Sequence, residues 1–143
     1  MKLSMIKVIQ LQGTDTALYE RVAPMVMNPK ILSYNHGYPF KTGEKFIWFI
    51  ALSDEEVIGF MPVEEKNREW VINNYYISPS GEEKVFNALL KAVCKLETKG
   101  KDLSAVVQTI HKPYFSDWGF KSQKEWKIYL KMTRNFQDEP AKE

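Results

Sequence analysis

Apolar and polar residues along the chain follow two periods, which together predict a series of strands and helices. Residues 5–11 alternate as a half-buried strand does, and residues 16–27 repeat apolar positions at helical spacing until Pro29 ends the helix. Residues 30–43 are aromatic and rich in turn formers, which indicates a short second helix and then a loop. Three β-rich runs follow and predict an antiparallel meander, at 44–52, 56–65 and 70–78.

The second half of the chain predicts one long helix between strands. Residues 82–99 carry an apolar face of period 3.6, and Gly100 follows as a stop signal. A strand at 103–108, a short helical segment at 112–118 and a strand at 125–133 complete the order. A strand reached through a helix joins its sheet by a parallel crossover. The pattern predicts an α+β (mixed α/β) fold with a mixed, mostly antiparallel sheet flanked by helices.

Length, charge and cysteine content narrow the class of protein. The 143 residues suit one compact domain, which we place at 1–133, with a flexible C-terminal tail at 134–143. A net charge of +2 gives no reason to expect nucleic-acid or membrane binding. The single cysteine, Cys94, excludes an internal disulfide, and no metal-binding spacing is present. The longest apolar run, 46–52, is too short to cross a bilayer, so we expect a cytoplasmic protein, with a homodimer left open.

The stretch YYISPSGEEKVFNALLKAV, residues 75–93, carries a strand directly into a helix. The first turn of a helix presents free N–H groups and the positive end of its dipole, so it can hold a phosphate. Glu82 and Glu83 occupy that turn and would repel an anion. Ser80 and Glu83 also have the spacing of a capping box, in which side chains use those N–H groups. The residues leave both interpretations open.

Two motifs resemble the GNAT superfamily of N-acyltransferases, over roughly residues 5–133. In that family the meander's last strand leads into V-x-P-x-x-R-x-x-G-x-G-x-x-L-L, whose backbone holds the pyrophosphate of acetyl-coenzyme A. Four positions match this motif: Ile77, Pro79, Leu89 and Leu90. The second signature, an aromatic residue before a Gly-Phe pair, is matched by Gly119-Phe120. The arginine and both glycines of the first motif are absent, and residues 82–87 (EEKVFN) replace them.

The resemblance implies where a coenzyme would lie. In the family the strand before the first motif splays from its neighbour, and its freed backbone holds the pantetheine arm and steadies the thioester carbonyl. The coenzyme-binding residues implied in this way are Tyr75, Tyr76, Ile77, Ser80, Gly81, Lys84 and Asn87.

Asn73 and Asn74 lie within that strand, although asparagine is a poor strand former. In a continuous strand, alternation would place Asn74 and Tyr76 on one face and Asn73 and Tyr75 on the other. Two interpretations stay open: a functional pair of amides, with Asn74 as a candidate catalytic residue, or a β-bulge or edge position with a solvated amide.

Acyl transfer needs a base for the acceptor amine and an acid for the leaving thiolate. In the family the acid is often a tyrosine of the short last helix. The usual place falls on Phe115 here, and its neighbour Tyr114 is either the acid or a packed aromatic. Glu69 and Glu64, on the predicted meander, are the candidate bases.

The loop after the first helix would face the acceptor in the family, and it supplies three candidate substrate-binding residues, Tyr34, His36 and Tyr38. Their rings would stack on a flat group or a peptide, or close the core. The acceptor is therefore open among a small-molecule, peptide or nucleobase amine. No pattern in the sequence brings His36 and His111 together.

Three hypotheses about function follow. The leading one is an N-acyltransferase that moves an acetyl or other acyl group from acetyl-coenzyme A to an amine. The main rival is a catalytically degenerate GNAT-like binding or interaction protein, whose phosphate loop Ser80 and Glu83 seal. The third is a nucleobase-modifying enzyme on the same scaffold, as in some phage GNAT-like enzymes.

Overall fold

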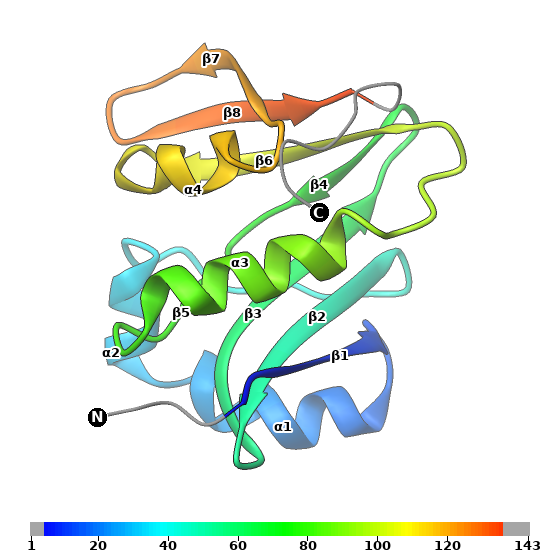
Figure 1. Ribbon diagram of the computed structural model, residues 1–143. Helices are drawn as coiled ribbons and strands as arrows, with labels where there is room; N and C mark the ends of the chain where they lie inside the picture. The colour runs from blue at the N-terminus through cyan, green and yellow to red at the C-terminus, as the bar shows by residue number, and fades with distance from the viewer. Residues whose placement is uncertain (1–4, 136–143) are drawn as a thin grey trace.

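A computed structural model describes residues 5–135, in which one mixed sheet carries helices against its faces (Figure 1). The elements are β1 (Lys7–Gln12), α1 (Thr16–Val26), α2 (Pro29–Tyr34), β2 (Phe46–Ser53), β3 (Glu56–Glu65), β4 (Glu69–Ile72), β5 (Tyr76–Ile77), α3 (Glu82–Val93), β6 (Asp102–Gln108), a 3₁₀ turn η1 (Thr109–His111), α4 (Lys112–Ser116), β7 (Lys121–Glu125) and β8 (Tyr129–Arg134).

Within the described residues the strand order is β1-β2-β3-β4-β6-β8-β7, and β5 pairs with β3 off this path. The pair β4 and β6 is parallel, and the other pairs are antiparallel. The predicted mixed, mostly antiparallel sheet and its parallel crossover through α3 are therefore confirmed.

Alternation along the strands divides the core into two apolar clusters on opposite faces of the sheet. Phe49 of β2 belongs to the larger cluster, which contains the apolar face of α3, whereas its neighbours Trp48 and Ile50 pack with α1. Gly59 of β3 lets α3 approach closely, because a Cβ there would lie 2.9 Å from Cγ1 of Val85. The position of α3, and so of its first turn, is thus fixed by packing.

Several predicted boundaries in the second half of the chain differ from the structure. The helix predicted at 82–99 ends at Val93, and the following segment is drawn toward β4, where Trp70 Nε1 donates a hydrogen bond to the Thr98 carbonyl at 3.2 Å. The strand predicted at 125–133 is instead the end of β7, a turn, and β8. Arg134, assigned to the tail, ends β8 opposite Leu103. The rest of the predicted tail, from 136, lies outside the described residues.

Candidate functional site

The strands β4 and β6 part in the middle of the sheet. Their parallel pairing ends at Ile72 opposite Ala105, and the next strand segment, β5, pairs with β3 instead. Between them Asn74 adopts a left-handed conformation with φ of 53°, which asparagine tolerates better than most residues. The continuous strand predicted at 70–78 is therefore wrong, because the chain is interrupted at the two asparagines.

This break shifts the alternation by one residue. Trp70 and Ile72 face the larger core cluster, and beyond the break Tyr75 and Ile77 face the same cluster. Tyr76 would lie on the same face as Ile72 in a continuous strand, but it packs into the opposite cluster instead. The break thus sends the Tyr75 side chain to the face covered by α3.

A buried hydrogen-bond network lies on that face, between β5, α3 and the segment after β6. Tyr75 Oη accepts a hydrogen bond from the Gln108 backbone N–H at 3.0 Å and lies 2.6 Å from His111 Nδ1. His111 Nε2 is 3.4 Å from Glu82 Oε1 and 3.4 Å from Tyr34 Oη. Tyr114 Oη donates to Glu82 Oε2 at 3.2 Å, so the network runs from the sheet to the surface.

Burial determines the protonation of this network. It lowers the pKa of His111, against the opposing effect of Glu82, and it raises the pKa values of Tyr75 and Tyr34. A neutral His111 that donates from Nε2 toward Glu82 leaves Nδ1 as an acceptor. In that tautomer the Tyr75 hydroxyl, which also accepts from Gln108, is the donor to Nδ1. Tyr75 then donates to His111, and His111 donates to Glu82.

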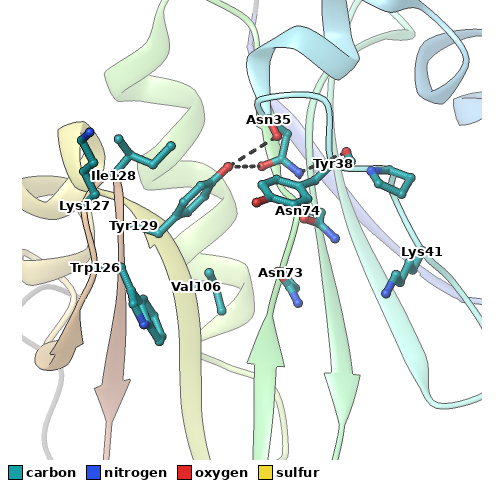
Figure 2. Close-up of a pocket in the computed structure, with 11 residues that line it drawn as sticks. Asn35, Tyr38, Lys41, Asn73, Asn74, Val106, Trp126, Lys127, Ile128 and Tyr129 are labelled. Atoms are coloured by element: carbon teal, nitrogen blue, oxygen red, sulfur yellow. Dashed lines mark hydrogen bonds between the residues drawn. The ribbon is translucent and has the colours of Figure 1, made fainter.

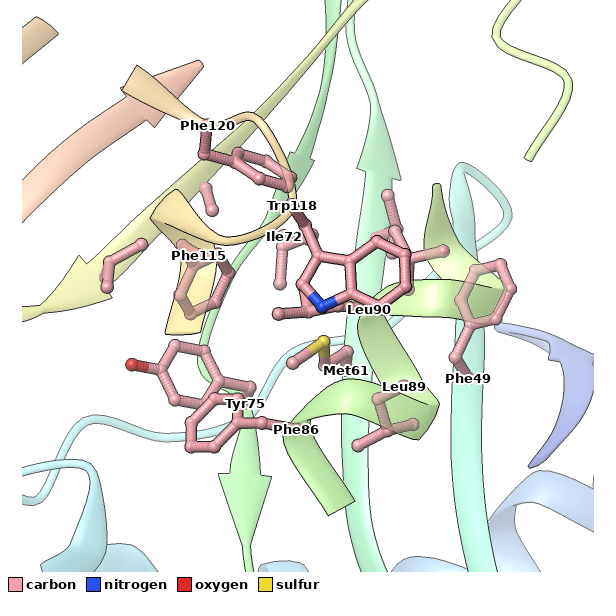
Figure 3. Packing of buried hydrophobic residues seen from close by; sticks show 14 of the residues in the cluster. Phe49, Met61, Ile72, Tyr75, Phe86, Leu89, Leu90, Phe115, Trp118 and Phe120 are labelled. Atoms are coloured by element: carbon pink, nitrogen blue, oxygen red, sulfur yellow. The ribbon is translucent and has the colours of Figure 1, made fainter. Parts of the chain in front are cut away.

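Side chains of α3 and α4 close over the network. The rings of Phe86 and Tyr114 are stacked with centroids 4.5 Å apart, and Trp118 Nε1 donates to Asn87 Oδ1 at 3.1 Å. Phe115 is fully buried, with its ring 5.6 Å from that of Tyr75 (Figure 3). The two helices are thus in direct contact where the resemblance places a coenzyme.

The start of α3 differs from the predicted capping box. Gly81 is the N-cap, with φ of 72°, and no side chain caps the helix. Because glycine readily adopts this left-handed conformation, the cap lies one residue beyond Ser80, and the Ser80–Glu83 box does not form. The backbone of the first turn is consequently available to an anion, but the Glu82 carboxylate turns toward His111 and Tyr114 and occupies the side of the turn nearest α4.

On the opposite face of the sheet, a pocket of about 570 Å³ opens where β4 and β6 part (Figure 2). It is lined by Asn35, Tyr38, Pro39, Lys41, Asn73, Asn74, Val106, Trp126, Lys127, Ile128 and Tyr129. Asn35 organises one wall, because its Nδ2 donates to Asn74 Oδ1 at 2.7 Å and its Oδ1 accepts from Tyr129 Oη at 3.2 Å. The segments that follow α2 and β4 meet the β7–β8 turn there.

The predicted substrate-binding and catalytic residues do not all lie together, because some line the pocket and others belong to the buried network. Tyr38 and Asn74 line the pocket, whereas Tyr34 and Tyr114 belong to the buried network. The His36 ring packs edge-on against Tyr129 at 5.6 Å without being a lining residue.

Glu69 lies at the far end of β4 from the pocket. Its carboxylate accepts hydrogen bonds from Ser104 Oγ at 2.6 Å and from Lys131 Nζ at 3.0 Å. Burial alone would raise the pKa of Glu69, but these bonds outweigh it and hold the pKa below its ordinary value. A carboxylate so engaged is a weak base, and the geometry does not support the role predicted for Glu69.

The implied coenzyme-binding residues also divide. Asn87 bonds to Trp118, and Tyr76 packs against Tyr34 and Phe60, so these two side chains are occupied by the core. Ser80, Gly81 and Lys84 are exposed at or before the first turn of α3.

Several residues of both regions were missed from the sequence. His111 is central to the network, yet its partners lie 36 and 77 positions away, at Tyr75 and Tyr34. Trp126 and Lys127 were assigned to a strand, and their place in a turn carries no glycine, proline or asparagine to reveal it. The asparagines at 73 and 74 were the one local signal that pointed to the site.

The part of the chain that the structure describes offers neither a metal-binding cluster nor a membrane-spanning helix. No group of three or more His, Cys, Asp or Glu side chains within residues 5–135 is placed to hold a metal ion. Among the helices in that range, none combines the length and the apolar character needed to span a bilayer.

Comparison with solved structures identifies the fold. The chain superposes on ElaA from Escherichia coli with a TM-score of 0.73 at 15% identity, covering 92% of this chain and 100% of that one. An acyl-CoA N-acyltransferase from Pseudomonas aeruginosa gives 0.65 at 13% identity, covering 90% and 99%. PaiA N-acetyltransferase from Thermoplasma acidophilum, in complex with coenzyme A, gives 0.61 at 14% identity, covering 93% and 100%.

No protein-family model and no curated protein matches the sequence. At these low identities the structural likeness establishes the fold, which is that of the GNAT superfamily, as the sequence motifs predict.

Proposed function

We propose that this protein is an N-acyltransferase that moves an acyl group from an acyl-coenzyme A to an amine bound in the pocket. One observation carries the proposal: the pocket opens where β4 and β6 part, beside the strand backbone that steadies the thioester in the family that the sequence resembles. The neighbours of the same fold include an acyl-CoA N-acyltransferase and an acetyltransferase in complex with coenzyme A.

One side chain of the network can supply a proton. Tyr114 lies at the outer end of the network, where its hydroxyl donates to the Glu82 carboxylate. We assign delivery of one proton, from the Tyr114 hydroxyl to the leaving thiolate, to this residue. Burial raises the pKa of Tyr114, and the Glu82 carboxylate raises it further, so the hydroxyl keeps its proton at neutral pH.

The backbone at the start of α3 fits a coenzyme, whereas the neighbouring side chains do not. The uncapped first turn of α3 suits a phosphate, while the Glu82 carboxylate and the Phe86–Tyr114 stack occupy the approach from α4. When bound, a coenzyme would supply the activated acyl group.

The closed contact between α3 and α4 also favours a second function, a binding protein that uses the pocket without a coenzyme. The buried polar groups of the network satisfy one another, so this face is complete without a ligand. The sealing groups are then Glu82, Phe86 and Tyr114, not the predicted Ser80 and Glu83.

Calorimetric titration with acetyl-coenzyme A separates the two functions. For an acyltransferase we expect a dissociation constant below about 1 mM, which corresponds to roughly 4 kcal/mol. The double substitution Glu82→Gln with Glu83→Gln should tighten binding several-fold, because it removes repulsion near the phosphate. Glu97→Gln, which removes one carboxylate from the loop after α3, is the control and should have no effect.

A protein that binds no acetyl-coenzyme A at millimolar concentration, in either the original or the doubly substituted form, would not be an acyl-coenzyme A-dependent enzyme. The binding-protein function would then stand, provided that the pocket takes a ligand.

A further inference from the structure

The pocket is unusual in its charge for a site that would receive a protonated amine. Of its eleven lining residues in the described chain, Lys41 and Lys127 are basic and none is acidic. A third cation, Lys124, lies with its Nζ 5.3 Å from the Trp126 ring centroid, at the same turn. An aliphatic polyamine would meet like charges here and no carboxylate to pair with.

Flat surfaces are exposed on two sides of the same pocket. Tyr38, from the loop after α2, is 58% exposed, and Trp126, from the β7–β8 turn, is 49% exposed. Tyr129 lies between them, held by edge contacts to His36 and Tyr38. Exposed aromatic rings that line a concavity offer their faces to a planar ligand.

One amide is free to read the edge of such a ligand. Asn35 and Asn74 are fixed by their mutual hydrogen bond, whereas the Asn73 side chain has no hydrogen-bond partner within residues 5–135. Figure 2 shows it directed into the pocket beside Val106. A carboxamide offers both a donor and an acceptor to a flat heterocycle or to an amino group.

We propose that the acceptor is a planar molecule that carries an anionic group, its ring between Tyr38 and Trp126, its polar edge at Asn73 and its anion at Lys41 and Lys127. The inference rests on the proposed function only in treating this ligand as the acceptor. Two sources share the chemistry, a nucleotide and an aromatic amino acid.

The test measures binding without coenzyme, so that it can fail or succeed independently of the acyltransferase assignment. The intact protein is titrated with 5′-AMP, L-tryptophan, adenosine and spermidine, by calorimetry or ligand-observed NMR. We expect 5′-AMP or L-tryptophan to bind, adenosine to bind more weakly than 5′-AMP, and spermidine not to bind. Preference for 5′-AMP identifies a nucleotide, and preference for L-tryptophan identifies an aromatic amino acid.

Substitutions then locate the ligand. Trp126→Ala should weaken binding by at least about fivefold, because an aromatic stacking partner is lost. Lys41→Ala with Lys127→Ala should reduce 5′-AMP to the affinity of adenosine, or weaken L-tryptophan severalfold. Lys91→Ala on α3 is the control and should change nothing. Spermidine binding as tight as that of the best planar anion, an unchanged Trp126→Ala variant, or no planar anion bound at about 10 mM would each overturn the proposal.

Discussion

At the point where β4 and β6 part, the two faces of the sheet differ in how far their side chains are buried and paired. On the α3 face, Tyr75 and His111 are almost completely buried and hydrogen-bonded to one another. On the other face, Tyr38 and Trp126 stand exposed around a pocket. One face is complete as it stands, and the other offers unfilled contacts.

A single backbone feature produces this difference. Because Asn74 has a left-handed conformation, Asn73 and Asn74 both line the pocket, and the next residue, Tyr75, faces α3. In an uninterrupted strand Tyr75 would share a face with Asn73. The lesson is that a site can be divided into a sealed half and an open half by one residue of backbone, without any insertion in the chain.

The largest expected effect comes from opening the sealed face. Tyr75→Phe removes the hydroxyl that accepts from Gln108 and contacts His111, and it leaves the Gln108 N–H and His111 Nδ1 buried without that partner. We expect unfolding free energy to fall by about 2–4 kcal/mol, since each orphaned group costs roughly 1–3 kcal/mol. Denaturant unfolding measures the loss, with Tyr38→Phe, on the open face, changing stability by less than about 0.5 kcal/mol. A loss below about 1 kcal/mol for Tyr75→Phe would contradict the network.

A change of pH should have a smaller effect on stability, because it adds one proton to His111 and deletes no hydrogen-bonding group. Burial lowers the pKa of His111 below its ordinary value of 6.5, so below pH 6.5 the unfolded chain binds more protons than the folded one. This contribution to stability is complete above pH 6.5 and is lost as pH falls below it, toward the folded-state pKa. Melting temperatures between pH 8 and pH 5 measure it.

His111→Gln should flatten that profile, whereas His36→Asn, which replaces an exposed histidine in a left-handed conformation, should leave it unchanged. Equal slopes for His111→Gln and the original protein would show that other groups cause the acid sensitivity.

The smallest effect on stability is expected at the rim of the sealed face. Tyr114→Phe keeps the stack on Phe86 and loses only the partly exposed bond to Glu82, so unfolding free energy should change by about 0.5 kcal/mol. If the protein transfers acyl groups, turnover should fall while the affinity for acetyl-coenzyme A stays the same. Turnover is measured as the release of free thiol. An unchanged turnover would exclude Tyr114 as the acid.

Much of the fold could be predicted because it depends on local periods. The strand at 56–65 has the predicted bounds, and the helix at 16–27 ends within one residue of prediction. The hairpin of β7 and β8 could not be predicted, because EWKIYLK alternates through the turn, which closes by a bond from Trp126 N–H to the Tyr129 carbonyl. The end of α3 was also unpredictable, since the contact of Thr98 with Trp70 is a tertiary one.

The candidate site could be predicted only where a residue type is unfavourable in the secondary structure that its neighbours predict. Asn73 and Asn74 are poor strand formers, and the chain does break there. The Ser80–Glu83 capping box was wrong, because the spacing of two side chains does not reveal that Gly81 takes the left-handed conformation. His111 gave no local signal, since its environment is supplied by distant parts of the chain.

The residues of the site are far apart in the sequence, and this separation has a consequence for synthesis and folding. Tyr34 meets His111 across 77 positions, Gln108 meets Tyr34 across 74, and Tyr129 meets Asn35 across 94. Contacts of such separation form only after large loops have closed, and the entropy of closure opposes them until the rest of the sheet is in place. The network on the α3 face therefore cannot be complete before His111 has been synthesised, and the pocket wall cannot be complete before Tyr129 has been.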